Sequence, residues 1–311
     1  RARIIAAVRR FFAARDFLEV ETPTLAPSPG MEPHLLAFRT EYVSETGHRR
    51  VPLYLPTSPE FHMKRLLCHG AERIFQLARS YRNGETGDLH QPEFCMLEWY
   101  RAHADYTAIM DDTEALAAAA ADAIHGEPVI QTGGGRIDLT PPWERLTVAE
   151  AWSRYTGIDL SACPSAPELR AAGRDIGVPH LLDDDPWDVL YFKIFLDRIE
   201  PYLGRERPVI LYEYPASMAA LARLKPGDPS VALRFEVYIA GIELANAFDE
   251  LTDPEIQLRR CEEARKIQQE SGRDPFPVDT AFIGALEQGM PPSAGIALGV
   301  DRLIMLILGK T

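Results

Sequence analysis

The chain has 311 residues, of which 46% are apolar, so it can bury a full core as one large domain or two modest ones. With 33 basic and 46 acidic residues its formal charge is −13, which excludes a protein that wraps nucleic acid over a uniformly basic surface. The sequence shows neither an apolar run of membrane-spanning length nor a signal peptide, so we expect no membrane partner.

The four cysteines are isolated from one another and never stand at the spacing of a metal site or a redox motif. They are Cys68, Cys95, Cys163 and Cys261. Reduced thiols are typical of cytosolic proteins, and we therefore expect a cytoplasmic location.

The first 55 residues predict a helix, a short strand and a hairpin. Residues 1–17 place five apolar side chains on one helical face: Ile4, Ile5, Val8, Phe11 and Phe12. This spacing fits either a surface helix or a helix at a subunit interface. A short strand follows and should end at Pro23, which lacks an amide donor. Residues 37–43 and 49–55 alternate as the strands of a hairpin.

A second helix is predicted to open at the segment Ser58-Pro59-Glu60, with Ser58 as N-cap, Pro59 at the first helical position and Gly70 as the stop. Glu60 then lies in the first turn. Acidic residues there commonly complement the helix dipole, so the spacing alone does not distinguish that role from ligand binding.

Two strand-like runs, residues 74–81 and 94–100, flank a polar loop that carries Arg82 and His90. A rigid strand pair with a charged connecting loop is well suited to present cations and hydrogen bonds to a polyphosphate.

The middle of the chain is mostly helical. Residues 105–125 form an alanine-rich helix, and Gly133–Gly135 form a turn that lacks the Lys-Ser/Thr of a phosphate loop. Residues 147–204 predict three helices. The first begins with a capping box at Thr147–Glu150, and another follows an Asp185 cap with Pro186 at the first helical position.

Strands at residues 208–214 and 231–239 precede a two-residue turn at Ala240–Gly241. That turn pairs Tyr238 with Glu243, which places Glu236 and Glu243 on one face of the sheet. Two converging carboxylates suit Mg²⁺, although solvated strand glutamates would show the same pattern.

Regular alternation would place Asn246 and Glu250 on the face opposite Glu243. A bulge near Ala245–Ala247 would re-aim them. Further helices are predicted from Asp253-Pro254 to near Gly272 and over residues 279–288, before an apolar helix at the C-terminal end.

Three segments together resemble the three motifs of class II aminoacyl-tRNA synthetases of the lysyl type. They are Val20–Pro23, the Tyr-Arg-Asn to Leu-Glu-Trp-Tyr segment ending at Tyr100, and Gly295–Arg302. The resemblance implies an α+β fold, with an antiparallel sheet of about six strands flanked by helices. It also implies a homodimer, and one catalytic domain over residues 1–311 with a helical insertion at roughly 101–207.

This resemblance implies adenylate-forming chemistry. Arg82 would bridge the substrate carboxylate and the α-phosphate of ATP, and Arg302 would lie over the adenine and reach the γ-phosphate. Glu236 and Glu243 would hold Mg²⁺. Further ATP contacts would come from Asn83, Gly84, His90, Gln91, Phe94, Glu243, Leu244 and Gly299.

The same resemblance implies a pocket for a substrate with two ammonium groups, because buried carboxylates reject uncharged amino acids. The residues expected there are Ser58, Pro59, Glu60, Tyr100, Asn246, Glu250 and Ala297, with Glu98 as a further candidate.

Two positions depart from the lysyl pattern. Gly84 stands where motif 2 carries Glu, so Glu85 or the backbone would have to make the adenine contact. Ala297 stands where lysyl-tRNA synthetases carry Gly, a difference of one methyl group worth about 1 kcal/mol between close analogues.

The sequence leaves no room for the anticodon-binding OB domain of a lysyl-tRNA synthetase before motif 1. Among relatives without it, the chain is most similar to the elongation factor P lysine ligases, which share the Met-Leu-Glu-Trp-Tyr ending of motif 2. That implies activation of (R)-β-lysine or lysine and transfer to the ε-amine of a lysine on elongation factor P, with no tRNA partner.

Three other functions stay open. One is a lysyl-tRNA synthetase core without its N-terminal domain, and another is an amino acid–ammonia ligase of similar fold. A non-catalytic paralogue is the third. Paralogues of that kind tend to lose the arginines or the acidic pair, whereas Arg82, Arg302, Glu236 and Glu243 are all present.

Overall fold

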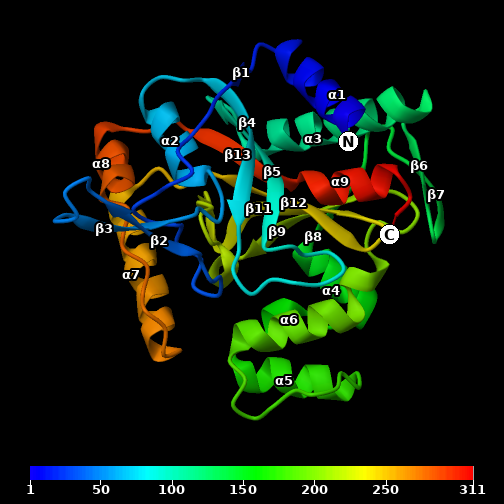
Figure 1. The fold of residues 1–311 in the computed structure, drawn as a ribbon. Coiled ribbons are helices and arrows are strands. Elements are labelled where there is room, and N and C mark those ends of the chain that lie inside the picture. Colours follow the sequence, from blue (N-terminus) through cyan, green and yellow to red (C-terminus); the bar gives the residue numbers. More distant parts are fainter. Residues whose placement is uncertain (311) are drawn as a thin grey trace. The chain divides into compact units, whose positions relative to one another are not determined.

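The computed structural model describes residues 1–310, and the chain forms two compact units (Figure 1). We call the first the motif unit; it comprises Arg10–Ile109 and Asp249–Arg302. The other, the middle unit, comprises Arg1–Arg9, Met110–Phe248 and Leu303–Thr311, with Thr311 outside the described residues.

The strands of the motif unit run in the order β1-β4-β5-β13. Their bounds are Leu18–Glu19 (β1), Arg73–Tyr81 (β4), Glu93–Ala102 (β5) and Ser293–Gly299 (β13). Strands β4, β5 and β13 are antiparallel, which confirms the predicted strand pair around the polar loop. The edge pair β1–β4 is parallel, so the expectation of a wholly antiparallel sheet was wrong.

The first strand also ends earlier than predicted, before Val20 rather than at Pro23. Val20 still donates its amide to the Phe75 carbonyl at 2.9 Å, but the pairing stops there.

Helix α2 (Glu60–Cys68) begins one residue later than predicted. Pro59 is the N-cap, and the Ser58 hydroxyl accepts only a long 3.4 Å bond from the Glu60 amide. Gly70, with φ +92°, follows the last turn as expected of a stop residue.

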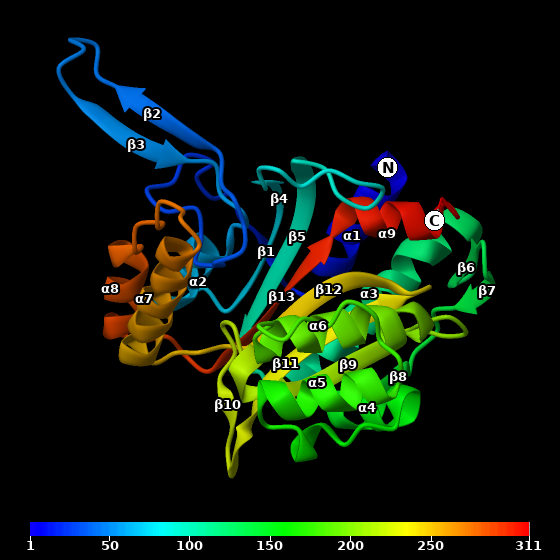
Figure 2. The same cartoon turned by 90° about the horizontal axis from the view of Figure 1, so that it is seen from below.

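Two further helices of this unit begin at aspartate caps, of which the one at Asp253 was predicted from the sequence. Asp253 accepts from the Ile256 amide at the start of α7 (Pro254–Glu270), and Asp279 accepts from Phe282 at the start of α8 (Thr280–Gln288), both at 2.9 Å. Figure 2 shows α2, α7 and α8 together, with the β2–β3 hairpin (Arg39–Val43 and Arg50–Tyr54) projecting beyond them.

The middle unit has strands in the order β12-β11-β9-β8, with β10 beside β11. They are β8 (Glu144–Thr147), β9 (Val209–Pro215), β10 (Leu224–Lys225), β11 (Asp228–Ile239) and β12 (Ile242–Asp249). Pairs β9–β11 and β11–β12 are antiparallel, and β8–β9 is parallel. The expected number of about six strands is therefore too low, because four belong to one unit and five to the other.

Helices fill much of the remaining middle unit, as predicted. They are α3 (Tyr106–His125, which starts in the motif unit), α4 (Val148–Thr156), α5 (Ala166–Asp175) and α6 (Trp187–Arg198). A small hairpin, β6 (Val129–Thr132) and β7 (Gly135–Asp138), confirms the turn at the three glycines. Short 3₁₀ turns complete the unit at Leu160–Ala162, Glu200–Tyr202 and Ala216–Met218.

The capping box of α4 is present, with the Thr147 hydroxyl accepting from the Glu150 amide at 3.1 Å. Asp185, in contrast, does not cap α6. Its carboxylate accepts from the Leu182 amide at 2.8 Å and pairs with Lys193 at 2.6 Å, so Pro186 takes the N-cap position.

Aromatic residues form much of the hydrophobic core of the middle unit. Trp152 of α4 and Tyr191 of α6 lie with ring centroids 4.9 Å apart, and Phe195 packs against Tyr238 of β11. Packing of this kind holds β11, which carries part of the predicted site, against α6.

Helices α1 (Ala2–Ala13) and α9 (Val300–Ile307) each run from one unit into the other. Of the five apolar side chains predicted to share a face of α1, all but the partly buried Ile5 are buried. Among residues 1–310, no helix combines the length and apolar character needed to span a bilayer. All four cysteines are free thiols.

Candidate active site

The motif unit contains a cluster of buried charges around a single lysine, Lys64. Glu60 and Lys64 lie one turn apart on α2, so both side chains project from the same face of that helix. The Lys64 Nζ atom is 2.5 Å from Glu60 Oε1 and 2.6 Å from Glu250 Oε2. Lys64 and Glu250 are each only 1% exposed, so this pairing takes place out of solvent.

Strand β5 adds a third carboxylate. Glu98 and Tyr100 are two residues apart, so both side chains lie on the same face of the strand. The Tyr100 hydroxyl donates to Glu98 Oε2 at 2.8 Å. Glu98 is fully buried, and its other oxygen, Oε1, has no hydrogen-bond partner. Glu250 Oε1 is also buried without a hydrogen bond. Two buried carboxylate oxygens are therefore available as acceptors.

The pKa values of this acidic cluster reflect the shortage of cations. Burial raises the pKa of Glu250 to about 8, against the opposing effect of Lys64. Burial likewise raises the pKa of Glu98 well above its ordinary value, and the neighbouring Glu60 raises it further. For Lys64, burial acts to lower the pKa, but the two glutamates outweigh it and the pKa rises. An added cation would be strongly stabilised here.

Strand β13 closes one side of the cluster. Its register places Gly295 opposite Tyr100 and Ala297 opposite Glu98. A Cβ at Gly295 would stand 2.2 Å from the Tyr100 ring and 2.8 Å from Glu250 Oε1, so only glycine fits. The expectation that Ala297 borders the amino-acid pocket is consistent with this register.

Sequence reasoning missed two charged residues of this region, Lys64 and Glu32. Glu32 lies two residues after Gly30, and a Cβ added at Gly30 would stand 2.6 Å from Glu32 Oε2. The Glu32 carboxylate accepts a 3.4 Å hydrogen bond from the Thr57 hydroxyl. Burial and the nearby Glu60 raise the pKa of Glu32, while Arg82 opposes the rise. Neither residue was singled out from the sequence. The i,i+4 spacing of Glu60 and Lys64 is a local signal, but Glu250, the other partner of Lys64, is distant in sequence.

The polar loop between β4 and β5 carries Arg82 beside Phe94, with the guanidinium carbon 5.2 Å from the ring centroid. Glu85 lies 3.9 Å from Arg82, and the Arg82 Nε atom is buried without a hydrogen bond. Gly84 has φ +81°, a backbone conformation that a glutamate would adopt only with strain. The backbone conformation of this loop therefore explains why glycine, and not glutamate, stands at position 84.

Arg302, at the start of α9, contacts the same loop. Its Nη2 atom is 2.9 Å from His90 Nε2. Burial and Arg302 lower the pKa of His90, so its ring is neutral and can accept this bond. Asn83 donates its amide to the Leu36 carbonyl at 2.8 Å, whereas the neighbouring Gln91 is exposed. The motif unit thus brings two arginines and a histidine to one loop.

In the middle unit, β11 and β12 join through the predicted two-residue turn, and Tyr238 pairs with Glu243 as expected. A bulge follows directly, because Val237 pairs with Ala245 and leaves Leu244 as the extra residue. The sequence permitted a bulge near Ala245–Ala247, and the observed one lies just before that segment. The bulge places Asn246 opposite Glu236, on the same face as Glu243, whereas in a regular strand Asn246 would lie on the other face.

Both carboxylate oxygens of Glu236 already accept hydrogen bonds. The hydroxyls of Tyr214 and Tyr238 both donate to Oε2 at 2.6 Å, and Arg234 pairs with Oε1. Arg234 also donates to Asn246 Oδ1 at 3.1 Å. Among residues 1–310 no three His, Cys, Asp or Glu side chains are arranged as a metal site. Glu243 is partly exposed and could reach a Mg²⁺ ion more easily than the buried Glu236. Two carboxylates are enough to bind Mg²⁺ when phosphate oxygens supply the other ligands.

Most of the predicted substrate and nucleotide residues lie in the motif unit. The exceptions, in the middle unit, are Glu236, Glu243, Leu244 and Asn246.

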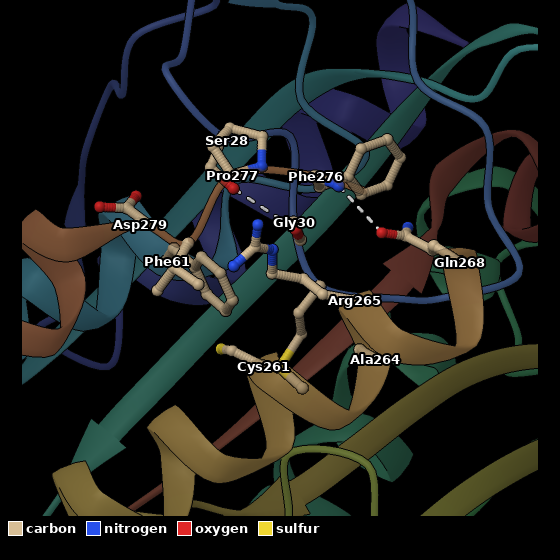
Figure 3. Close-up of a pocket in the computed structure, with 12 residues that line it drawn as sticks. Ser28, Gly30, Phe61, Cys261, Ala264, Arg265, Gln268, Phe276, Pro277 and Asp279 are labelled. Atoms are coloured by element: carbon tan, nitrogen blue, oxygen red, sulfur yellow. Dashed lines mark hydrogen bonds between the residues drawn. The ribbon is translucent and has the colours of Figure 1, made fainter. Parts of the chain in front are cut away.

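A pocket of about 240 Å³, partly open to solvent, lies behind the Ser28–Met31 loop (Figure 3). Helix α7 lines it through Cys261, Arg265 and Gln268, and Phe61 of α2 closes another side. Gln268 accepts from the Phe276 amide at 2.9 Å. No predicted site residue lines this pocket.

Comparison with known proteins gives a consistent result. The family model described as tRNA synthetases class II (D, K and N) matches residues 1–311. A protein of Yersinia enterocolitica named elongation factor P–(R)-β-lysine ligase is 42% identical over 310 residues, covering 99% of this chain and 90% of the relative. Proteins of the same name from Yersinia pestis and Yersinia pseudotuberculosis are 41% identical over 309 residues, with the same coverage.

Proposed function

This chain belongs to the tRNA synthetases class II (D, K and N), and from that premise we propose that it activates (R)-β-lysine or lysine with ATP and ligates it to elongation factor P. The observation that carries the proposal is the buried acidic cluster. Glu60, Glu98 and Glu250 lie around one internal cation, Lys64, and two of their buried oxygens, Glu98 Oε1 and Glu250 Oε1, have neither a hydrogen bond nor an ion pair. A substrate with two ammonium groups would satisfy both the charge and the unused acceptors.

In the first step a carboxylate oxygen of the amino acid attacks the α-phosphorus of ATP. The bond from that phosphorus to the bridging oxygen of pyrophosphate breaks, and an aminoacyl-adenylate forms. Arg82 neutralises the two anions that must approach each other, and Arg302 with His90 binds the phosphates. When bound, Mg²⁺ offsets the charge of pyrophosphate, and we assign Glu243 with Glu236 to hold it.

The nucleotide base is bound by the motif 2 loop and the end of β13. Phe94 stacks on the adenine, and Asn83, Gly84 and Gln91 contribute loop contacts. Gly299 allows close approach of the backbone, and Leu244 contributes beside Glu243. Because Gly84 has no side chain to reach the adenine, we assign that interaction to Glu85, which lies close to Arg82.

The substrate is oriented by two sets of residues. Ser58, Pro59 and Glu60 at the start of α2 receive the amino group near the reacting carboxylate. Glu250 and Tyr100 receive the distant ammonium, and Ala297 with Asn246 limits the remaining space. This division follows the lysyl-type resemblance.

In the second step an amine of the acceptor attacks the acyl carbonyl, loses a proton and releases AMP. The names of the relatives support elongation factor P as acceptor, through the ε-amine of a lysine. We further propose a cytoplasmic homodimer that does not charge tRNA.

ATP–pyrophosphate exchange tests the first step, with (R)-β-lysine, lysine and norleucine compared. We expect exchange with the two dicationic amino acids and none with norleucine, which lacks the distant ammonium. Glu60→Gln should lower kcat/KM for lysine about a hundredfold, while Glu41→Gln, on the exposed β2–β3 hairpin, should have no effect. Exchange with norleucine at a comparable rate would contradict the assignment of the pocket.

Acceptor assays test the second step. We expect radiolabelled (R)-β-lysine to reach elongation factor P and not a variant in which its acceptor lysine is replaced. Charging of tRNA without modification of the protein would instead support a lysyl-tRNA synthetase core.

A further inference from the structure

Lys64 is a buried cation that the proposed chemistry does not use. Its side chain is 1% exposed, and its Nζ atom lies 2.5 Å from Glu60 and 2.6 Å from Glu250. A lysine that only stabilised a helix would gain more at the surface, since burying an ammonium group has a large desolvation cost.

Lys64 contacts one oxygen of each of two carboxylates. Lys64 donates to Oε1 of Glu60 and forms an ion pair with Oε2 of Glu250. Neither oxygen of Glu250 has a hydrogen bond, and Oε1, which faces Gly295, has no ion pair either. In the neighbouring carboxylate, Glu98, one oxygen is likewise bound and the other is not. The Tyr100 hydroxyl donates to Oε2, and Oε1 has no hydrogen bond.

We propose that Lys64 is a positioning residue, which holds Glu60 and Glu250 in fixed orientation so that each keeps one oxygen for an ammonium group of the substrate. The inference rests on the proposed function and extends it to a residue outside the substrate contacts. Because Glu60 and Glu250 come from elements distant in sequence, their common ammonium partner also fixes the distance between them.

Other charged groups around Lys64 would not replace it. The titratable groups that face the cluster are Cys68 on α2, Glu98 and Tyr100 on β5, Asp249 beside Glu250, and Glu32 beside Glu60. All of these are acidic or neutral, and the nearby cation Arg82 acts on Glu32 rather than on Glu250. Without Lys64, like charges in a buried site would favour proton uptake by the glutamates, and a protonated carboxyl is a poor acceptor for an ammonium group.

The direct test is Lys64→Met, measured by ATP–pyrophosphate exchange with lysine varied at saturating ATP and with ATP varied at saturating lysine. We expect KM for lysine to rise at least tenfold and KM for ATP to change less than twofold. Lys266→Met is the matched control, because Lys266 forms an exposed i,i+4 pair with Glu270 at 3.7 Å, and it should change neither value. A merely structural role would lower the active fraction and leave both KM values unchanged.

A double-mutant cycle with Glu250→Gln provides the second test, and it remains informative should Lys64→Met fail to fold. The variant Lys64→Met/Glu250→Gln removes one charge of each sign, which favours folding. Because Lys64 also holds Glu60, the comparison is completed on a background that lacks both carboxylates: adding Lys64→Met to Glu60→Gln/Glu250→Gln should change kcat/KM for lysine less than threefold. A larger loss there would show that Lys64 acts independently of both glutamates and would overturn the proposal.

The unsubstituted protein separates this inference from the proposed function. Absence of lysine-dependent exchange in that protein would refute the proposed function. Normal exchange there, with an unchanged KM for lysine in Lys64→Met, would refute the role of Lys64 alone.

Discussion

Each unit of the chain buries a charged cluster, and the two clusters differ in how far their carboxylates are satisfied. In the middle unit, Glu236 accepts from two tyrosine hydroxyls and pairs with Arg234. In the motif unit, three carboxylates share Lys64 and one tyrosine hydroxyl, and Glu98 and Glu250 each retain a buried oxygen without a hydrogen bond. A saturated cluster stabilises the fold, whereas an unsaturated one has capacity left for a ligand.

The largest expected effect concerns the saturated cluster. Arg234→Met removes the one cation that residues 1–310 place against Glu236, and also a hydrogen bond to the Met218 carbonyl at 2.8 Å. Because the glutamate stays buried without its cation, the free energy of unfolding should fall by about 3–5 kcal/mol, measured by urea denaturation.

Arg50→Met is the control for that measurement, because Arg50 pairs with Glu41 at 2.6 Å on the exposed hairpin. Loss of this pair should cost about 0–1 kcal/mol. Equal effects for the two arginines would mean that the cluster around Glu236 does not stabilise the fold as described.

The unsaturated cluster predicts a pH dependence of substrate binding. Burial raises the pKa of Glu250 to about 8, and an ammonium substrate needs the ionised carboxylate. From pH 6 to 8, kcat/KM for lysine should therefore rise, by at most about tenfold per pH unit. Glu250→Gln should flatten this limb, and an unchanged slope in that variant would assign the titration to another group.

The same pKa shift has the opposite consequence for stability without substrate. Glu250 titrates near 4.5 in the unfolded chain and near 8 in the folded one, so folding takes up a proton between these values. Stability contributed by the protonated form should be greatest below pH 4.5 and should decline as pH rises towards 8. The urea midpoint of the free protein, compared with Glu250→Gln across this range, measures the decline.

The glycine beside this cluster offers a test of its shape. Gly295→Ala would bring a methyl group onto the Tyr100 ring and Glu250 Oε1, so kcat/KM for lysine should fall about tenfold or more through overpacking. Gly284→Ala, on α8, meets no atom within 4 Å and should leave exchange unchanged. Equal activities of the two variants would show that the cluster can open at little cost.

The smallest expected effect is at Ala297. Ala297→Gly removes one methyl group opposite Glu98, worth about 1 kcal/mol, or roughly fivefold in relative kcat/KM. We expect the change to favour lysine over (R)-β-lysine, because lysyl-tRNA synthetases carry glycine there. Paired exchange assays with the two isomers measure the ratio, and a shift towards (R)-β-lysine would reverse our assignment.

Local patterns predicted much of the fold. The strands around the polar loop, the turn before Glu243 and the cap of α7 follow from alternation, positive-φ turn positions and aspartate placement, and all are observed. Asp185 failed as a cap because the Leu182 amide and Lys193 are its partners instead, whereas Ser58 stands one residue before the observed N-cap, Pro59.

The site was less predictable. Glu60 and Glu250 could be chosen through the family motifs, but Lys64 looked like any polar residue on a helix. Its second partner, Glu250, is brought to it only by the tertiary fold. Likewise, the two tyrosine bonds to Glu236 arise from strand pairing, which no local spacing specifies.

One extra residue in β12 decides which side chains Arg234 meets. Leu244 shifts the phase of every later position, and Asn246 faces Arg234 and Glu236 only for that reason. If Leu244 paired with Val237 as in a regular strand, Ala245 and Ala247 would face the charges in place of Asn246. Homologous chains can therefore share every polar residue of this segment and still differ in chemistry, if one of them pairs these strands without the bulge.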